Sequence, residues 1–212
     1  MKNNEVVILL HGLGLSSYTL LYIEHSLAAM GYETINVDYP SRGYCVTDLF
    51  DIVSTIIAQK NDSFNKYDKV HFVGHSLGGI LARMLALSYQ DANLGVCVAL
   101  GSPNKGSSLA KQLSSWRLIR GHFGPALFDI CPQSEFINSL DSLPTRYSLI
   151  AGTRSKFTFF GWWFDNINDG TVMLNEMIPS SLVSKDVYHF DVSHSSMLFN
   201  KDVKDKIIEL LR

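Results

Sequence analysis

Six short apolar runs rich in β-branched residues limit the folds open to this chain. They read as buried strands and cover residues 6–12, 33–39, 69–76, 95–103, 146–153 and 187–194. Their apolar character is continuous, as expected for a parallel sheet with helices on both faces. Between them, apolar residues recur at helical spacing over 18–31, 47–60, 77–90 and 201–212. This alternation predicts an α/β fold with a doubly wound, mostly parallel sheet of about six strands.

Two residues mark expected helix ends. Gly31 follows the first helical segment, where glycine is favoured as a C-terminal cap, and Thr47 begins the second as an N-cap. No repeat, low-complexity tract or linker divides the chain, so we predict one domain over 1–212.

Residues 104–144 interrupt the alternation of strands and helices. They separate two predicted strands by about forty residues, far more than a simple loop needs. Such an insertion is either a small cap or lid over a site or one or two ordinary helices flanking the sheet. The sequence leaves both interpretations open.

Composition excludes several classes of protein. The formal net charge is −2, without any block of like charges, so we expect no nucleic-acid partner. The odd number of cysteines argues against a disulfide framework, and no spacing typical of a metal site occurs. The three cysteines, Cys45, Cys97 and Cys131, are expected to be small buried hydrophobic residues in a reducing compartment.

The chain carries no predicted membrane anchor. Its first apolar run, Val6 to Leu10, is too short for a signal peptide, and no stretch approaches the length of a membrane span. We therefore expect a cytoplasmic protein, exported only if a leader has been removed. Peripheral contact with a membrane stays open.

A candidate nucleophile lies at the end of the third predicted strand. Gly74-His75-Ser76-Leu77-Gly78 has the pattern GxSxG, between a strand and a helix. That context suits a strained turn that raises the Ser76 hydroxyl above the sheet, with the helix N-terminus aimed at developing negative charge. The alternative is a tight turn with an inert serine. No GxGxxG or P-loop pattern supports a nucleotide, so no cofactor is expected.

A general base and an acid can be chosen by their position in the chain. His194 ends the last strand, where its imidazole can reach the carboxyl edge of the sheet, whereas His189 lies mid-strand and is expected to be structural. Asp169 precedes Gly170 in a turn that could hold its carboxylate, with Asp165 as the alternative acid. The acid would fix the tautomer of His194.

The loop after the first strand offers an anion site. His11-Gly12-Leu13-Gly14 combines small residues that let backbone donors approach a developing oxyanion. The amides of Leu13 and Leu77 are the expected donors. His11 and His75 are expected to brace the neighbouring loops.

The motifs together resemble the α/β-hydrolase superfamily, and within it the small bacterial lipases and esterases. They are HGLG at 11–14, GHSLGG at 74–79, GSPNKGS at 101–107, NDGTV at 168–172 and VSHSSML at 192–198. The resemblance implies the same roles: Ser76 as nucleophile, Asp169 as acid and His194 as base. It also implies an oxyanion hole formed by Leu13 and Leu77.

These residues predict a carboxylic-ester hydrolase that works through an acyl-enzyme on small-molecule or lipid esters. A thioesterase, amidase, phospholipase or acyltransferase would use the same triad, and a hydrolase-like binding module is the non-enzymatic alternative. The aromatic run at 157–164, with Trp162 and Trp163, either packs a loop on the core or contacts acyl chains or lipid. The sequence favours the first reading.

Overall fold

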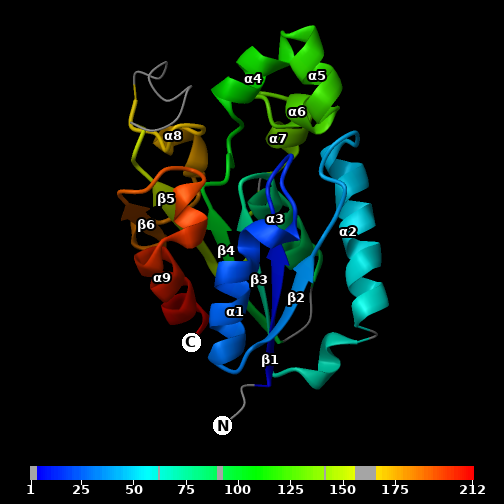
Figure 1. Ribbon diagram of the computed structural model, residues 1–212, viewed down its shortest axis with the longest axis vertical. Helices are drawn as coiled ribbons and strands as arrows, with labels where there is room; N and C mark the ends of the chain where they lie inside the picture. The colour runs from blue at the N-terminus through cyan, green and yellow to red at the C-terminus, as the bar shows by residue number, and fades with distance from the viewer. Residues whose placement is uncertain (1–3, 62, 90–92, 141, 156–165) are drawn as a thin grey trace.

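A parallel sheet forms the centre of the molecule (Figure 1). The computed structural model describes residues 4–61, 63–89, 93–140, 142–155 and 166–212, to which every structural statement below is confined. The described strands follow the order β2-β1-β3-β4-β5-β6, and each neighbouring pair is parallel. They are β1 (Glu5–Leu10), β2 (Glu33–Val37), β3 (Lys69–His75), β4 (Leu94–Leu100), β5 (Tyr147–Gly152) and β6 (Val187–Phe190). The six predicted strands and the α/β fold class are confirmed.

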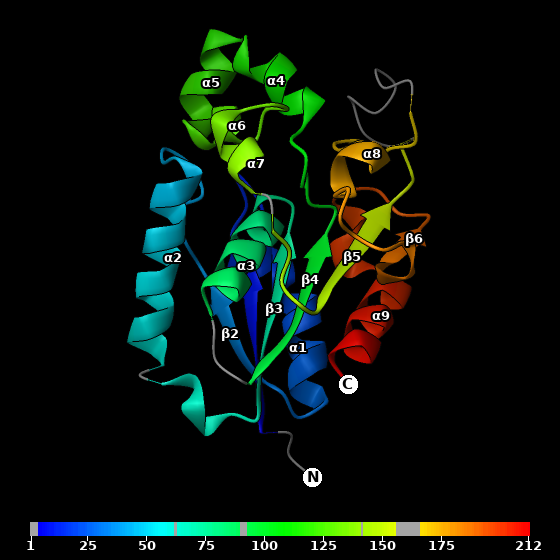
Figure 2. The same cartoon turned by 180° about the vertical axis from the view of Figure 1, so that it is seen from behind.

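Helices cover both faces of this sheet (Figures 1 and 2). On one face, α2 (Val46–Lys60) and α3 (Leu77–Ser88) pack on the side chains of Val6, Ile8 and Leu10. On the other, α1 (Leu21–Ala29) and α9 (Lys201–Leu211) pack on Val7 and Leu9. Because successive strand residues point to opposite faces, a strand buried on both sides is mostly apolar, which explains the nearly continuous apolar runs.

The register brings the loops of the central strands to one edge. Leu10 at the end of β1 pairs with Gly74 of β3, and His75 pairs with Leu100 at the end of β4. The segments that follow these three strands therefore begin side by side, which is the edge where ligands bind in open α/β sheets.

The insertion after β4 forms a group of short helices beyond this edge (Figures 1 and 2). They are α4 (Ser108–Ser114), α5 (Arg117–Phe123), α6 (Ala126–Asp129) and α7 (Glu135–Ser139). Of the two interpretations of 104–144, the cap describes the structure, because these helices extend past the strand ends instead of lying along a sheet face. We refer to α4–α7 as the cap.

The remaining described elements are short. They are η1 (Ser17–Leu20), η2 (Phe64–Lys66), α8 (Leu174–Met177), η4 (Ser184–Asp186) and η5 (Ser196–Phe199). Among the described residues, no helix is long and apolar enough to span a bilayer.

One of the two expected helix ends was wrong. Gly31 follows α1 with a positive φ of 94°, as a C-terminal glycine should. However, α2 begins one residue earlier than predicted, and its N-cap is Cys45, whose Sγ accepts from the Asp48 amide. Thr47 lies inside the first turn, where its hydroxyl contacts the Cys45 sulfur instead of capping the helix. Because Cys45 caps a helix start at the surface it is only partly buried, as is Cys131, so the expectation of buried cysteines holds for Cys97 alone.

Candidate active site

Ser76 lies at a sharp turn between β3 and α3. Its φ of 55° and ψ of −122° put a residue with a side chain in backbone space that favours glycine. The turn requires glycine on both sides: a Cβ on Gly74 would be 2.1 Å from the Gly78 carbonyl oxygen, and one on Gly78 would be 2.2 Å from that of Leu10. The GxSxG pattern is thus a steric requirement of the turn that carries the Ser76 side chain.

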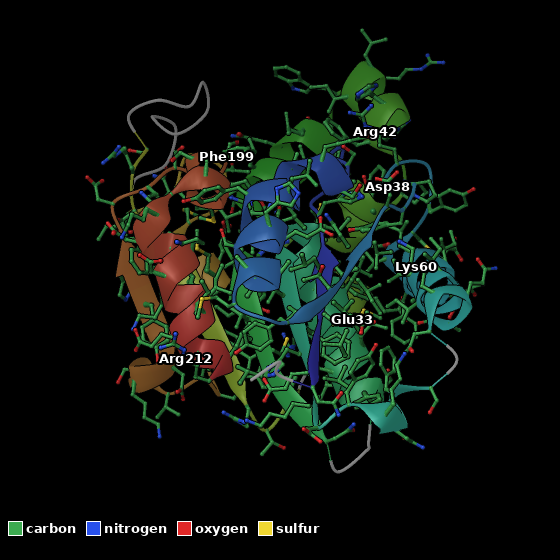
Figure 3. The ribbon with its side chains drawn as sticks, turned by 60° about the horizontal axis from the view of Figure 1, so that its bottom comes forward. Glu33, Asp38, Arg42, Lys60, Phe199 and Arg212 are labelled. Carbon is green, nitrogen blue, oxygen red and sulfur yellow. The ribbon has the colours of Figure 1, made fainter. Side chains whose placement is uncertain are left out.

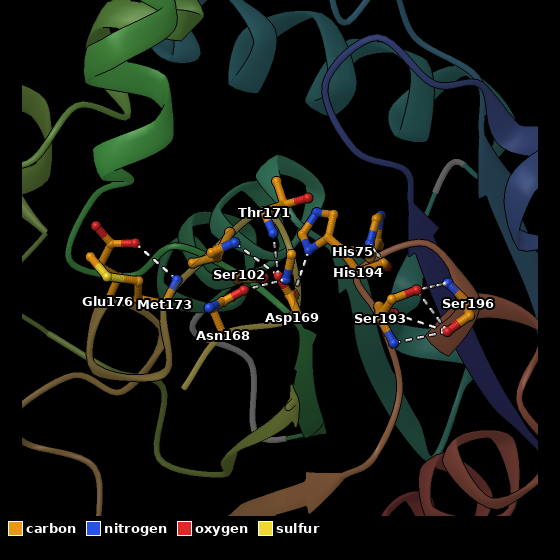
Figure 4. Close-up of polar contacts among 12 residues, drawn as sticks. His75, Ser102, Asn168, Asp169, Thr171, Met173, Glu176, Ser193, His194 and Ser196 are labelled. Atoms are coloured by element: carbon orange, nitrogen blue, oxygen red, sulfur yellow. Dashed lines mark hydrogen bonds and ion pairs between the residues drawn. The ribbon is translucent and has the colours of Figure 1, made fainter. Parts of the chain in front are cut away.

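His194 and Asp169 form a buried pair close to this turn (Figure 4). His194 Nδ1 is 2.6 Å from Asp169 Oδ2, and the His194 amide donates to the Asp169 carbonyl at 2.8 Å. The other carboxylate oxygen, Oδ1, accepts from the amides of Thr171 and Val172 at 2.9 and 2.8 Å. Because an ionised carboxylate only accepts, Nδ1 carries a proton and Nε2 is left as the basic atom.

Ser76 and His194 line the same cavity, which has a volume of about 190 Å³. Most of its wall is apolar. The cap contributes the largest share, with Leu109, Ala110, Leu113, Phe123, Leu127 and Ile130. The site therefore combines a few polar groups at the strand ends with an apolar chamber roofed by α4, α5 and α6, as binding sites for small apolar groups commonly do.

His75 braces the His194 loop, as expected. Its Nε2 donates to the His194 carbonyl at 2.9 Å, and the two ring centroids are 4.6 Å apart. Burial lowers the pKa of His75 well below its usual value, and the neighbouring His194 lowers it further. The ring is therefore neutral and holds the loop by a hydrogen bond to a carbonyl, a contact that does not change near neutral pH.

The loop after β1 is held by bonds from several segments. His11 Nδ1 donates to the Gly12 carbonyl at 3.0 Å, and its ring stacks on Tyr39. The Gly14 amide donates to the Ser41 hydroxyl at 2.9 Å, while Arg42 donates to the Gly14 carbonyl. Among the described residues, the amide between these anchors, that of Leu13, has no acceptor.

Leu77 supplies a second amide of the same kind. It is the first residue of α3, and the first amides of a helix have no acceptor within the helix. The amides of Leu13 and Leu77 thus belong to the two segments that flank Ser76.

Comparison with known proteins decides the family. The model of the alpha/beta hydrolase family matches residues 7–194, most of the chain. This chain is an α/β hydrolase.

Solved structures share the fold of this α/β hydrolase. The mature form of the Bacillus licheniformis lipase BlEst2 is 21% identical, with a TM-score of 0.75 over 97% of this chain and 91% of that one. The monoacylglycerol lipase of Paleococcus ferrophilus is 17% identical, with a TM-score of 0.65 over 97% and 93%. The metagenomic carboxyl esterase MGS0156 is 20% identical, with a TM-score of 0.64 over 93% and 66%. At these identities the likeness establishes a common fold.

Sequence reasoning missed two residues that shape the site of this α/β hydrolase. Gly101, just after β4, has a φ of +57°, and a Cβ there would be 3.0 Å from Asp169 Oδ2 and 3.1 Å from His194 Nδ1. Any side chain at this position would crowd the contact between Asp169 and His194. The segment 101–107 stood out in the sequence, but nothing in it indicated which atoms the glycine faces.

Glu176 is the second residue (Figure 4). This buried carboxylate accepts from the Ser108 amide at 2.6 Å and from the Met173 amide at 3.0 Å. It therefore joins the start of α4 in the cap to the segment that follows Asp169. Its only sequence signal, an acidic residue three positions after Met173, is common at helix starts.

The other residues that the sequence analysis considered do not belong to this described site. His189 is exposed on the edge strand β6, so the expectation that it is a satisfied structural histidine was wrong; the edge position leaves its ring in solvent. Asp165, Trp162 and Trp163 lie outside the described residues. Within the described part of the chain, no three His, Cys, Asp or Glu side chains gather as metal ligands.

Proposed function

We propose that this α/β hydrolase cleaves carboxylic esters through an acyl-enzyme formed on Ser76. The observation that carries the proposal is the buried pair of His194 and Asp169, 2.6 Å apart, together with the cavity that His194 shares with a serine on a strained turn. The shared fold with a lipase, a monoacylglycerol lipase and a carboxyl esterase adds support.

The reaction begins at the serine. Ser76 Oγ attacks the ester carbonyl carbon while His194 Nε2 accepts the hydroxyl proton, and Asp169 stabilises the imidazolium that results. The carbonyl oxygen becomes negative and receives hydrogen bonds from the amides of Leu13 and Leu77. Both amides belong to backbone that is already fixed, so little reorganisation is needed as charge develops.

Collapse of the intermediate breaks the bond between the carbonyl carbon and the alcohol oxygen. His194 gives its proton to the departing alcohol, which leaves Ser76 acylated. Water then loses a proton to His194, attacks the acyl carbon and releases the acid, with the proton returned to Ser76 Oγ. The apolar cavity under the cap holds the acyl chain during both halves.

Replacing Ser76 with alanine tests the proposal. Ser76→Ala should lower kcat for p-nitrophenyl esters by about 10⁵-fold or more, as loss of a triad nucleophile does elsewhere. It should also abolish labelling by a fluorophosphonate probe, which reacts only with an activated serine. Ser195→Ala is the matched control, because Ser195 lines the same cavity and should keep both labelling and turnover.

Two outcomes would reject this assignment. Retained turnover in Ser76→Ala with an unchanged melting temperature would exclude Ser76 as the nucleophile. An unlabelled, folded wild-type protein would instead indicate a binding module on the hydrolase fold.

A further inference from the structure

The cap has apolar side chains on its outer side as well as toward the cavity. Trp116, which precedes α5, is 53% exposed, Leu118 in α5 is 89% exposed and Phe128 in α6 is 41% exposed. On the inner side, Phe123 and Leu127 of the same two helices line the cavity. The inner residues are explained by the chamber, whereas the outer ones have no such role within the fold.

The charge of this segment differs from that of the whole chain. Residues 104–128 contain four basic residues and no Asp or Glu, although the chain has a net charge of −2. Two of them, Arg117 and Arg120, are exposed on α5 between the apolar residues. The Arg120 guanidinium lies 5.9 Å from the centre of the Phe128 ring. The next acidic residue, Asp129, accepts a hydrogen bond from the Val46 amide, so it is engaged with α2.

We propose that this face, which we call the cap tip (Trp116, Arg117, Leu118, Arg120 and Phe128), docks on the surface of an anionic phospholipid bilayer. Exposed tryptophan and leucine beside arginine form the pattern by which short amphipathic elements enter the headgroup region. The apolar side chains reach the acyl boundary, and the guanidinium groups remain at the phosphates.

Position in the molecule favours a bilayer over a protein partner. The cap stands at the end of the molecule opposite the start of β1 and the end of α9 (Figure 1). Arg212, at the C-terminal end of α9, lies far from the cap, as the view in Figure 3 also shows. Three exposed apolar side chains at such an end are few for a stable protein interface, which buries about 800 Å² per partner. A small basic, apolar tip is sufficient for reversible attachment to an anionic surface, because each Lys or Arg there raises the partition coefficient by roughly fivefold.

Vesicle co-sedimentation tests the proposal without using turnover. The wild-type protein and Ser76→Ala should both bind vesicles of phosphatidylcholine with about 30% phosphatidylglycerol, and bind far less to phosphatidylcholine alone. Raising salt from about 0.1 M to about 1 M should weaken the binding, because the Debye length falls to about 3 Å. Vesicle binding does not depend on Ser76. Absence of binding would therefore reject the membrane proposal without affecting the proposed ester hydrolysis, and loss of the proposed hydrolysis would leave the membrane proposal intact.

Two double variants separate the apolar and the charged parts of the cap tip. Arg117→Ser with Arg120→Ser should lower the partition coefficient on anionic vesicles by roughly tenfold or more. Trp116→Ser with Leu118→Ser should lower the partition coefficient by a similar factor, because the variant lacks the apolar surface that these two side chains bury in the bilayer. These side chains do not line the cavity, so turnover of a water-soluble short ester should remain unchanged.

A matched control is available at the other end of the sheet. Val183 is 58% exposed and Lys185 is exposed, and both precede β6 at the amino ends of the strands. Val183→Ser with Lys185→Ser removes one apolar and one basic side chain and should leave vesicle binding unchanged. Equal loss in this control would overturn the proposal, because binding would then depend on overall charge.

Tryptophan fluorescence locates the contact. The chain has three tryptophans, so Trp162→Phe with Trp163→Phe leaves Trp116 alone. Its emission should be quenched by vesicles that contain brominated acyl chains. Absence of quenching in a variant that sediments with vesicles would reject the cap tip as the contact. Concentration-dependent self-association that requires Trp116 and Leu118, without vesicle binding, would assign the face to a second copy of the chain and overturn the lipid proposal.

Discussion

Filling the cavity from α4 should shorten the acyl chain that the protein accepts. Ala110 lines the cavity and is almost fully buried. A dry protein cavity of about 150 Å³ holds benzene, which corresponds to roughly 25 Å³ per carbon. The cavity of about 190 Å³ then accommodates an acyl chain of roughly seven or eight carbons. Ala110→Leu adds three carbons to its wall, which leaves room for about four or five.

The expected loss follows from the excluded methylenes. About three methylenes of an octanoyl chain would lose burial at roughly 0.8 kcal/mol each, which totals about 2–2.5 kcal/mol. The ratio of kcat/KM for octanoate to that for butanoate should therefore fall by about 30- to 70-fold. Helix propensity changes little, because leucine is nearly as good a helix former as alanine.

A series of p-nitrophenyl esters from acetate to laurate measures this shift. Leu113→Ala, which enlarges the same cavity from α4, should move the preference the opposite way, toward longer chains. Parallel loss on short and long esters in Ala110→Leu, with the melting temperature unchanged, would refute the assignment of this cavity to the acyl chain. An unaltered preference in both variants would do so as well.

Three further predictions concern the pair, the turn and acid stability. Asp169→Asn should lower kcat by roughly 10³- to 10⁴-fold in the same ester assay, because the amide no longer holds His194 in the required tautomer; a loss below tenfold would contradict the role. Gly74→Ala should prevent folding as judged by circular dichroism, since its Cβ would meet a backbone carbonyl oxygen at 2.1 Å. At Gly121 a Cβ would have no atom within 4 Å, so the control Gly121→Ala should stabilise α5 by about 0.5–1 kcal/mol. Burial, with two nearby basic side chains, lowers the pKa of His71 to about 4 from 6.5. The unfolded chain therefore binds this proton first as pH falls, so the free energy of unfolding should drop by about 2–3 kcal/mol between pH 6.5 and 4; His71→Gln should flatten that drop in urea titrations.

The strands and the serine turn could be predicted because local physics fixes them. A strand buried on both faces carries mostly apolar side chains, so β1 and β3 were evident from their apolar runs. The turn at Ser76 excludes side chains at Gly74 and Gly78, so the residues next to Ser76 in the sequence are enough to predict the turn. His194 was predicted from its place at the end of the last apolar run, although β6 ends at Phe190 and leaves His194 in the loop that follows the strand.

Contacts between distant segments could not be predicted in the same way. His75 is next to Ser76 in sequence, yet its bond to the His194 carbonyl spans 119 positions. Gly101 faces two atoms that belong to later loops, and Glu176 joins a cap helix to the segment after Asp169. No spacing rule relates such residues, because the fold alone brings them together.

The sequence by itself determined the layered α/β fold and the order of the candidate nucleophile, acid and base, since both depend on periodicity and on small residues in turns. The tertiary structure decided what lies around them. It showed that 104–144 stands beyond the strand ends as a cap, that this cap closes an apolar cavity on one side, and that it exposes a basic, apolar tip on the other. Burial is a property of packed neighbours, so which face of a short cap helix meets solvent is settled only when the whole chain is folded.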